Sequence, residues 1–218
     1  MTDKYIIALD GPSSSGKSTL AKKLADKLEI EYLNTGSMYR AVTKYFLDKG
    51  IIEGDLIDFD NIFSKINIEF DKNKIFLNGE DVTEEIRNDK ITNNVSWVSS
   101  IREVREFLVE SQRQIAKDTS FILDGRDIGT VVFPNARYKF FLTASPRIRA
   151  QRRFNQGEID KSLDEIEKDI IKRDKYDSNR EVSPLKRADD AIEIDNSDLT
   201  IDQTIDLMLE KMDGKNAL

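Results

Sequence analysis

The sequence of 218 residues contains no cysteine, no histidine and a single tryptophan. Without cysteine, the chain has no disulfide framework, no thiol nucleophile and no thiolate metal site. Without histidine, it lacks imidazole general bases, phosphohistidine intermediates and the usual zinc ligands. Any catalytic chemistry must therefore use carboxylates, lysine, arginine, hydroxyls and backbone amides. A cysteine-free chain also suits the reducing cytoplasm, which is the compartment we expect.

Long apolar runs and excess positive charge are missing as well. The first apolar run, Tyr5–Leu9, is too short for a signal peptide, and no run approaches the ~20 residues that span a bilayer. The formal net charge of −7 argues against a nucleic-acid partner held by bulk positive charge. We therefore expect a soluble protein without membrane or nucleic-acid partners, built as one domain or a core with a modest insertion.

Short apolar runs alternate with helical patterns along most of the chain. The runs that are typical of buried parallel strands are Tyr5–Leu9, a short strand before Asn34, Phe121–Leu123, Lys139–Leu142 and Ala191–Ile194. Helical spacing between them favours an α/β fold with a doubly wound parallel sheet.

Helix boundaries are also visible. Met38–Lys49 has the pattern of a helix that Gly50 closes with a left-handed residue. Ser162–Glu165 is a capping box before a long charged helix, and Thr200–Gln203 is a similar box before the last helix.

One region departs from this alternation. In Ile66–Phe70 and Ile75–Leu77 apolar residues alternate with polar ones, and Asp71–Lys74 between them predicts a turn. This pattern predicts a half-exposed β-hairpin, unlike the buried parallel strands. We interpret residues 60–95 as an inserted subdomain.

Between the first strand and the next helix, Gly11–Ser18 matches G-x-x-x-x-G-K-[ST] at every fixed position. Glycines allow the backbone to wrap a phosphate group with its N–H groups inward, Lys17 reaches the β- and γ-phosphates, and the Ser18 hydroxyl can coordinate Mg²⁺. The start of the helix adds its positive dipole end. The predicted ATP-binding residues here are Gly11, Pro12, Ser13, Ser14, Ser15, Gly16, Lys17, Ser18 and Thr19.

A chance match to these fixed positions is expected in about one chain of this length in a hundred. The strand–loop–helix context makes chance less probable still. A P-loop alone indicates only a nucleoside triphosphate, because switches, motors, transporters and small-molecule kinases share it.

Arginines and acids near loops and helix ends point to an acceptor site. Asp124–Gly129 follows a buried strand, and Arg149, Arg152 and Arg153 cluster after Ser145-Pro146. The spacing of Arg173, Asp177 and Arg180 places them on one helical face. Each group also has a purely structural interpretation. Asp124 can be a turn residue at a strand end, Arg149–Arg153 a solvated helix face, and the Arg173 group ordinary salt bridges. Beside a P-loop they favour phosphoryl transfer, which depends on positioning and charge neutralisation.

Five segments carry a family resemblance, namely Asp10–Ser13, Thr35–Arg40, Val104–Glu106, Asp124–Pro134 and Arg173–Arg180. Through them nearly the whole chain resembles the bacterial cytidylate kinases, a branch of the nucleoside monophosphate kinases, and Asp124–Pro134 is the most specific segment. The resemblance implies a P-loop NTPase core with a parallel five-stranded sheet flanked by helices (residues 1–59, 96–144 and 161–218). It also implies a monophosphate-binding subdomain (60–95) and a short lid (145–160).

The resemblance also implies roles for single residues. It assigns catalysis to Lys17, Arg126, Arg149 and Arg153, and adds Arg152 to the ATP site. It assigns the metal to Ser18 and, through water, to Asp124. The implied CMP-binding residues are Thr35, Tyr39, Arg40, Ser96, Arg105, Arg126, Asp127, Arg173, Asp177 and Arg180. In these roles Arg40 and Arg126 grip the acceptor phosphate, Arg180 sits by the phosphates, and Arg173 and Asp177 hold the sugar. Ser96, Arg105 and Asp127 read the cytosine edge.

Two positions lead to further expectations, one about base selection and one about acceptor affinity. A carboxylate at Asp127 can accept from the exocyclic amine of cytosine, whereas uracil presents a carbonyl there, so we expect CMP to be preferred to UMP. Asn34 departs from the family, which usually has aspartate just before Thr35-Gly36. The amide keeps the hydrogen-bonding shape and loses the charge, so we expect activity to survive with altered acceptor affinity.

The expected activity is therefore in-line transfer from MgATP to CMP or dCMP, giving ADP and CDP or dCDP, by a monomer. One alternative is a P-loop kinase for another small acceptor, such as a different nucleoside monophosphate or shikimate. Another is a nucleotide-dependent binding protein, which would leave the acceptor-side arginines without a use. The sequence has no clear guanine-reading N-K-x-D motif.

Overall fold

The computed structural model describes residues 4–71, 74–157 and 161–216, which form two compact units. Unit 1 comprises Met1–Leu33 and Asp118–Leu218, and unit 2 comprises Asn34–Lys117. Residues 72–73 of the predicted turn, residues 158–160 of the predicted lid and the two ends of the predicted core lie outside the described residues.

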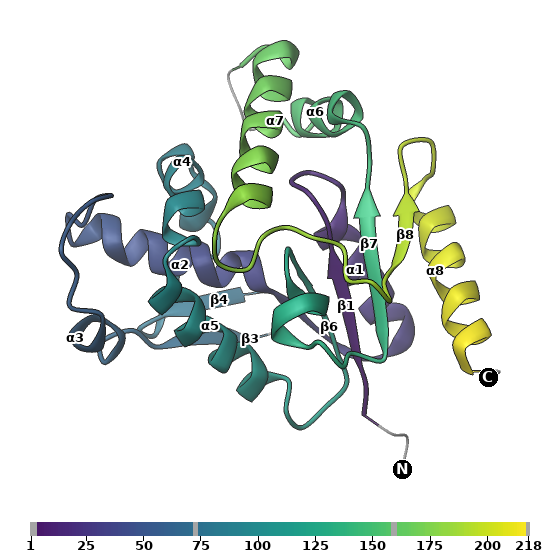
Figure 1. The fold of residues 1–218 in the computed structure, drawn as a ribbon, viewed down its shortest axis with the longest axis horizontal. Helices are drawn as coiled ribbons and strands as arrows, with labels where there is room; N and C mark the ends of the chain where they lie inside the picture. The colour runs from purple at the N-terminus through teal and green to yellow at the C-terminus, as the bar shows by residue number, and fades with distance from the viewer. Residues whose placement is uncertain (1–3, 72–73, 158–160, 217–218) are drawn as a thin grey trace. The chain divides into compact units, whose positions relative to one another are not determined.

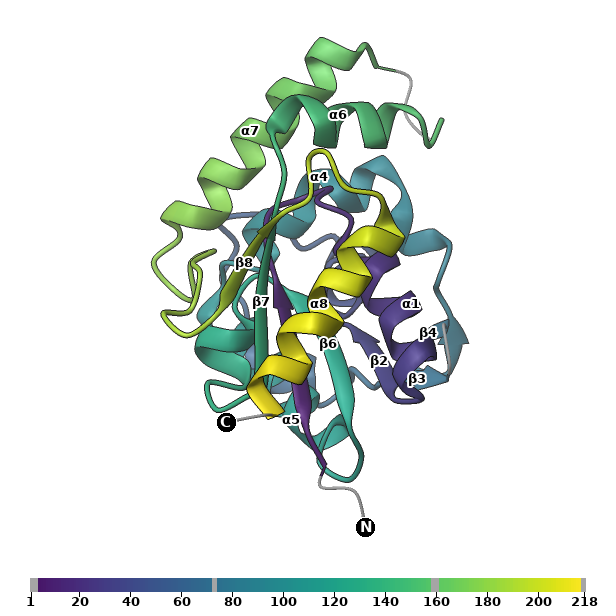
Figure 2. The ribbon, with the colours of Figure 1, turned by 90° about the vertical axis from the view of Figure 1, so that its right-hand side faces the viewer.

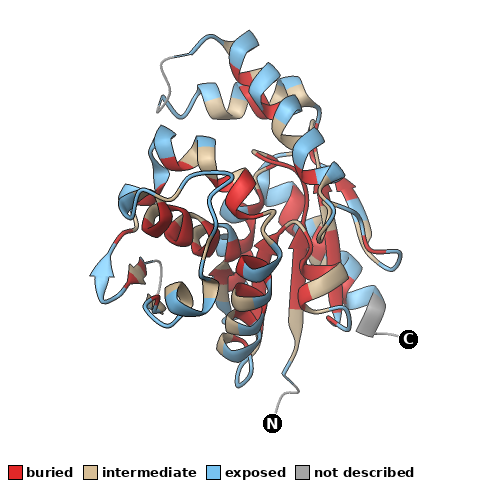
Figure 3. Ribbon diagram, turned by 60° about the vertical axis from the view of Figure 1, so that its left-hand side comes forward, coloured by how far each residue is buried: buried red, intermediate tan, exposed pale blue. Residues whose placement is uncertain are grey.

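A five-stranded sheet forms the centre of unit 1 (Figure 1). Its strands are β1 (Ile6–Asp10), β2 (Glu31–Asn34), β6 (Phe121–Gly125), β7 (Tyr138–Thr143) and β8 (Ile192–Asp195). Their order is β2-β6-β1-β7-β8, with β1 parallel to β6 and β7, and β7 parallel to β8. Every residue of β6 and all but the first of β1 are buried, which explains their continuous apolar runs (Figure 3). The predicted fold class is confirmed.

Four α-helices and one π-helix complete unit 1. They are α1 (Lys17–Leu28), the π-helix η2 (Ile128–Val132), α6 (Pro146–Phe154), α7 (Leu163–Asn179) and α8 (Ile201–Asn216). Helices α1 and α8 cover one face of the sheet (Figure 2), where Leu20, Leu24 and Met208 are fully buried in one cluster with the strand residues. The parallel sheet therefore brings the carboxyl end of β1, the P-loop and the segment after β6 to one edge.

Helices α6 and α7 pack on each other through Ala150, Ile166 and Ile170. The capping box at Ser162 is present: its side chain accepts from the Glu165 backbone, and the Glu165 carboxylate accepts from the Ser162 backbone N–H. The predicted lid contains α6, whose N-cap is Ser145 and whose first residue is Pro146.

Unit 2 combines helices with a small antiparallel sheet. Its elements are α2 (Thr35–Asp48), α3 (Phe59–Phe63), β3 (Ile68–Asp71), β4 (Lys74–Leu77), β5 (Glu80–Asp81), the 3₁₀-helix η1 (Glu85–Arg87), α4 (Asp89–Val98) and α5 (Arg102–Ile115). The predicted hairpin is confirmed, with Phe70 opposite Ile75. A third strand, β5, follows a turn in which Asn78 and Gly79 both have positive φ.

The limits of unit 2 and of the predicted subdomain differ in extent. Unit 2 contains the whole of 60–95 and also α2 and α5. The narrower subdomain remains a prediction. Helix α2 begins at Thr35, three residues before the predicted start, and Gly50 beyond it has a φ of 71° as expected for a left-handed terminator. No helix among the described residues is both long and apolar enough to cross a membrane.

Candidate active site: a phosphate-binding loop with a cluster of arginines

Two glycines shape the loop between β1 and α1. Gly11 has a φ of 150°, and a Cβ at this position would lie 2.0 Å from the Leu142 carbonyl oxygen of β7. Gly16 has a φ of 90° and precedes the first residue of α1. Only glycine permits this backbone path, which turns the chain sharply from strand to helix. The geometry agrees with the phosphate-binding loop predicted from the sequence.

Lys17 lies inside this loop. The residue is 5% exposed, and its Nζ donates to the Pro12 carbonyl at 2.6 Å and to the Ser15 hydroxyl at 3.2 Å. Burial, with Arg126 nearby, holds the pKa of Lys17 well below its ordinary value. An anionic ligand beside this amine would favour its charged form.

The two predicted metal ligands are in direct contact. The Ser18 hydroxyl, at the start of α1, donates to Asp124 Oδ2 at 2.8 Å, and the Tyr32 hydroxyl donates to Asp124 Oδ1 at 2.8 Å. Burial raises the pKa of Asp124, and the Lys17 charge opposes that shift. A hydroxyl and a carboxylate at the mouth of a phosphate loop are oxygen donors of the kind that Mg²⁺ takes, so these residues fit a magnesium ion.

A contact that the sequence did not predict joins α6 and α7 to the loop. Arg149 Nη1 forms an ion pair with Asp174 Oδ2 at 2.6 Å and donates to the Ser13 carbonyl at 2.9 Å. Asp174 Oδ1 accepts from the Ser13 backbone N–H at 3.2 Å. Arg149, one of the predicted catalytic residues, is 4% exposed and thus a fixed part of the loop wall. The only sequence signal for Asp174 was its place beside Arg173.

Asn196 is a second residue that the sequence reasoning missed. Its side-chain N–H donates to the Ser15 carbonyl at 3.1 Å, and its side-chain oxygen accepts from Arg152 Nη1 at 3.0 Å. Arg152 Nη2 also donates to the Asn196 carbonyl at 2.7 Å. Because Asn196 directly follows β8, the sheet edge shared by the carboxyl ends of parallel strands was the signal that could have indicated it.

Arginines from three segments of unit 1 converge beyond the loop. Arg126 Nε donates to Asp177 Oδ2 at 3.0 Å. Burial lowers the pKa of Arg173 to about 10, and the charges of Arg126 and Arg153 add to this effect. Its Nε has no hydrogen-bond partner within the described residues. Like charges held together in a buried place favour an anion between them.

Asp177 carries the compensating charge in this cluster. Burial acts to raise its pKa, but the neighbouring arginines hold it below the ordinary value, so the carboxylate is ionised at neutral pH. One detail of the sequence reasoning is wrong. Arg180 does not share a helical face with Arg173 and Asp177, because α7 ends at Asn179 and Arg180 has the extended backbone of a C-cap residue.

Asp127, the predicted base-reading residue, immediately precedes η2. It is 4% exposed, and its Oδ1 lies 4.0 Å from Arg180 Nη2. Its side chain does not cap its own helix. A buried carboxylate opposed by an arginine is an acceptor with a defined direction, which suits the reading of an amine. A π-helix directly after it is a feature that recurs at functional sites.

Five of the predicted CMP-binding residues belong to unit 2. Thr35 opens α2 and is buried, and Ser96 lies half-buried on α4. Arg40 donates to the Ile86 carbonyl at 2.9 Å and to the Thr92 hydroxyl at 3.0 Å. The Arg105 guanidinium lies 5.2 Å from the centre of the Tyr39 ring. Arg105 also donates to the Ser99 carbonyl at 3.0 Å, so unit 2 holds these two arginines in fixed orientations.

Asn34 has a structural use that accounts for its residue type. Its side-chain oxygen accepts from the Ser37 backbone N–H at 3.0 Å and caps α2. Asparagine and aspartate cap helices about equally well. The substitution therefore preserves the start of the helix that carries Tyr39 and Arg40.

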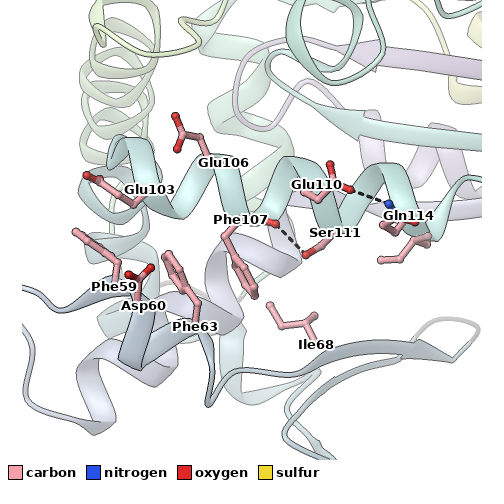
Figure 4. Close-up of a pocket in the computed structure, with 11 residues that line it drawn as sticks. Phe59, Asp60, Phe63, Ile68, Glu103, Glu106, Phe107, Glu110, Ser111 and Gln114 are labelled. Atoms are coloured by element: carbon pink, nitrogen blue, oxygen red, sulfur yellow. Dashed lines mark hydrogen bonds between the residues drawn. The ribbon is translucent and has the colours of Figure 1, made fainter.

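Unit 2 also has an open groove of about 650 Å³ between α3 and α5 (Figure 4). Phe63 and Phe107 stack on its floor with ring centres 4.5 Å apart, while Glu103, Glu106 and Glu110 follow one another along α5. None of the five predicted CMP-binding residues of unit 2, all described, lines this groove. Its carboxylates would repel phosphate, so it is not the nucleotide site.

Comparisons with known proteins decide the family. The family model for cytidylate kinase matches residues 7–214. This chain belongs to the cytidylate kinase family. It is 45% identical to a cytidylate kinase of Fusobacterium nucleatum over 97% of this chain and 98% of that protein. It is 47% identical to one of Clostridioides difficile, over 95% and 97% of the two chains.

Solved structures show the same fold at much lower identity. A gluconokinase of Sinorhizobium meliloti matches with a TM-score of 0.52 and 11% identity, over 97% of this chain and 94% of that one. A shikimate kinase of Bacteroides thetaiotaomicron matches with a TM-score of 0.50 and 14% identity, over 98% and 99%. These likenesses concern the fold alone. Membership of the cytidylate kinase family is what separates the chain from kinases with other acceptors.

Proposed function

We propose that the protein transfers the γ-phosphoryl group of ATP to the phosphate of CMP or dCMP, giving ADP and CDP or dCDP. The observation that carries the proposal is the cluster of Arg126, Arg153 and Arg173 in the same unit as the phosphate loop, within a chain of the cytidylate kinase family. A P-loop protein that only bound or hydrolysed a nucleotide would have no use for a second, half-buried set of arginines outside the loop.

The acceptor explains why the chain needs no histidine. A nucleoside monophosphate is largely ionised at neutral pH, so its oxygen can attack the γ-phosphorus without a general base. The transition state spreads charge over the transferred group, and catalysis depends on positioning and neutralising that charge. Lys17 would serve the transferring phosphates from inside the loop. Arg149 and Arg153, on α6, would add positive charge from the lid side.

Ser18 and Asp124 would hold Mg²⁺, the serine directly and the aspartate through water. Their contact at 2.8 Å supports this role, since both offer oxygen atoms beside the loop. The ion would neutralise phosphate charge and fix the geometry of ATP. Tyr32 keeps the Asp124 carboxylate oriented from β2.

Arg173 and Asp177 would hold the sugar, and Asp177 also positions Arg126. Arg126 would grip the acceptor phosphate, with Arg180 beside the phosphates. Bidentate guanidinium groups are suited to this task because their fork matches a phosphate group. The buried Nε of Arg173 supports the assignment, because a buried donor needs an acceptor.

Asp127 would read the base by accepting a hydrogen bond from the cytosine amine. With UMP the carboxylate would face a carbonyl, leaving two acceptors without a donor. We extend the proposal to Thr35, Tyr39, Arg40, Ser96 and Arg105 as the CMP-binding residues of unit 2. We also propose that the 60–95 subdomain and the 145–160 lid close over the substrates to exclude water, since an open site would hydrolyse ATP.

The substrate class is tested by an ADP-release assay with ATP and, in turn, CMP, dCMP, UMP, AMP, dTMP and shikimate. We expect strong stimulation by CMP and dCMP, weaker stimulation by UMP and none by shikimate. Absence of stimulation by CMP would overturn the proposal. We further propose that the protein acts as a monomer in the cytoplasm. Light scattering can test the first claim and cell fractionation the second.

A further inference from the structure

Asp10, the last residue of β1, makes an unusual pair of contacts across unit 1. Its Oδ1 accepts from the Ile128 backbone N–H at 2.8 Å, and its Oδ2 accepts from the Gly129 backbone N–H at 2.8 Å. The residue is 4% exposed. No motif in the sequence explains a buried aspartate here, because the phosphate loop begins one residue later.

The two N–H groups belong to the first two residues of η2. The first N–H groups of any helix lack partners within the helix, and the side chain of the N-cap residue usually accepts from one of them. Asp127 stands at the N-cap of η2 but makes no such bond. Asp10, from another strand, satisfies the helix start instead. Asp127 Oδ1 lies 4.0 Å from Arg180 Nη2.

Gly129 lies beside both Asp10 and the Lys139 side chain. A Cβ at this position would lie 3.2 Å from Lys139 Cδ and 3.4 Å from Asp10 Oδ2. Lys139 in turn donates to the carbonyl of Pro134, just beyond η2. The π-helix is therefore held at its start by Asp10 and at its end by Lys139, and both come from strands of the rigid sheet.

We propose that Asp10 is a positioning residue for the nucleotide base: by binding the start of η2 it directs the Asp127 carboxylate toward the acceptor. This proposal rests on the base-reading role of Asp127 in the proposed function. In this role Asp10 acts through η2 and not by contact with a substrate. It links the strand before the phosphate loop to the segment that selects the acceptor.

The test is Asp10→Asn, assayed at pH 8. An asparagine oxygen can keep one N–H bond, but its amide group faces the other N–H and cannot accept from it. We expect the KM for CMP to rise about tenfold and the CMP-to-UMP preference to fall about tenfold, as the loss of one buried acceptor implies. The KM for ATP should change by less than about twofold, because the loop from Gly11 onward is untouched.

Asp58→Asn is the matched control. Asp58 caps α3 by accepting from the Asn61 N–H, is exposed, and lies in unit 2. Asparagine caps as well as aspartate, so this variant should keep wild-type constants. Gly129→Ala is the second variant, because its new Cβ would press on the Lys139 side chain, which binds the segment just beyond η2. It should reduce the CMP-to-UMP preference as well.

Hydrogen exchange separates this proposal from the proposed function. The Ile128 and Gly129 amides should exchange slowly in the wild type and at least about tenfold faster in Asp10→Asn. Unchanged exchange overturns the positioning contact, whatever the activity. If exchange rises but kcat and both KM values worsen by one common factor, Asp10 is only structural and the proposal fails. If CMP does not stimulate ADP release by the wild type, but its Ile128 and Gly129 amides exchange slowly, only the proposed function is contradicted.

Discussion

Arg149, which is buried, and Asp174, which is half-buried, form an ion pair at 2.6 Å that ties α6 and α7 to the phosphate loop. Arg149 also donates to the Ser13 carbonyl, and Asp174 accepts from the Ser13 N–H. One loop residue is thus held through both of its backbone groups. The part of the lid nearest the loop is fixed to it.

Asp174→Asn should weaken this connection. The buried Arg149 would keep its charge and lose its counter-ion, which costs on the order of 1–3 kcal/mol in the free energy of unfolding when one partner of such a pair is neutralised. The KM for ATP should rise, since the single oxygen of asparagine cannot serve both Arg149 and the Ser13 N–H. Asp169→Asn, which changes an exposed partner of Lys161 on the same helix, is the control. Equal urea midpoints for the two variants would contradict the role of Asp174.

Replacement of Lys17 should remove transfer without unfolding the chain. Lys17→Met keeps the volume and removes a charge that burial already makes costly, so the thermal midpoint should not fall. The loss of one preorganised charge at the transferring group should lower kcat about 10²–10³-fold or more. Lys22→Met, at an exposed position of α1, should remain fully active. A near-normal kcat of Lys17→Met would contradict a catalytic role of Lys17 in the phosphate loop.

Asp127→Asn should change base selection more than rate. An amide can either accept or donate, so the variant should tolerate the uracil carbonyl and narrow the CMP-to-UMP ratio of kcat/KM by about tenfold or more. Asp177→Asn offers the contrast, because a residue that contacts the sugar should affect both nucleotides alike. If the ratio for Asp127→Asn equals that of the wild type, another residue reads the base.

The burial of Asp10 predicts a pH-dependent stability. Burial raises its pKa to about 7; the N–H groups of Gly129 and Ile128 lower it, Asp127 adds to the rise, and Lys17 opposes it. Because the folded state binds the proton more tightly than the unfolded chain, this stabilisation is complete below about pH 4. It is lost as the pH rises to about 7, and amounts to about 4 kcal/mol. Denaturant titrations from pH 4 to 8 measure the free energy of unfolding of the wild type and of Asp10→Asn. The wild-type value minus the Asp10→Asn value should fall as the pH rises. A constant difference would contradict the burial effect.

The sequence predicted those parts of the fold that depend on local pattern. Apolar runs such as Phe121–Leu123 located the strands, and the Ser162–Glu165 box located the start of α7. The short strand β5 was missed because two exposed acidic residues carry no strand signal. The prediction that Arg180 shares a helical face with Arg173 and Asp177 was wrong, because spacing alone does not show where a helix ends.

The candidate site also contains a part that local sequence patterns predicted and a part that they did not. The phosphate loop was visible because its glycines and Lys17 occur at fixed spacing in one segment. Asp174 and Asn196 were not, since each acts through a contact with residues more than 150 positions away along the chain. Asp10 belongs to Asp10–Ser13, one of the segments that carry the family resemblance. Its bonds to η2 exist only once β1 and β6 lie side by side. Long-range hydrogen bonds leave no periodic trace in a sequence.

The most direct test of the account follows the γ-phosphoryl group itself. The protein is incubated with Mg²⁺, ATP labelled with ³²P at the γ-position, and CMP, and the products are separated. The account predicts label in CDP, little label in inorganic phosphate, and loss of labelled CDP in Lys17→Met. Label that appears only in inorganic phosphate, with CMP recovered unchanged, would contradict it.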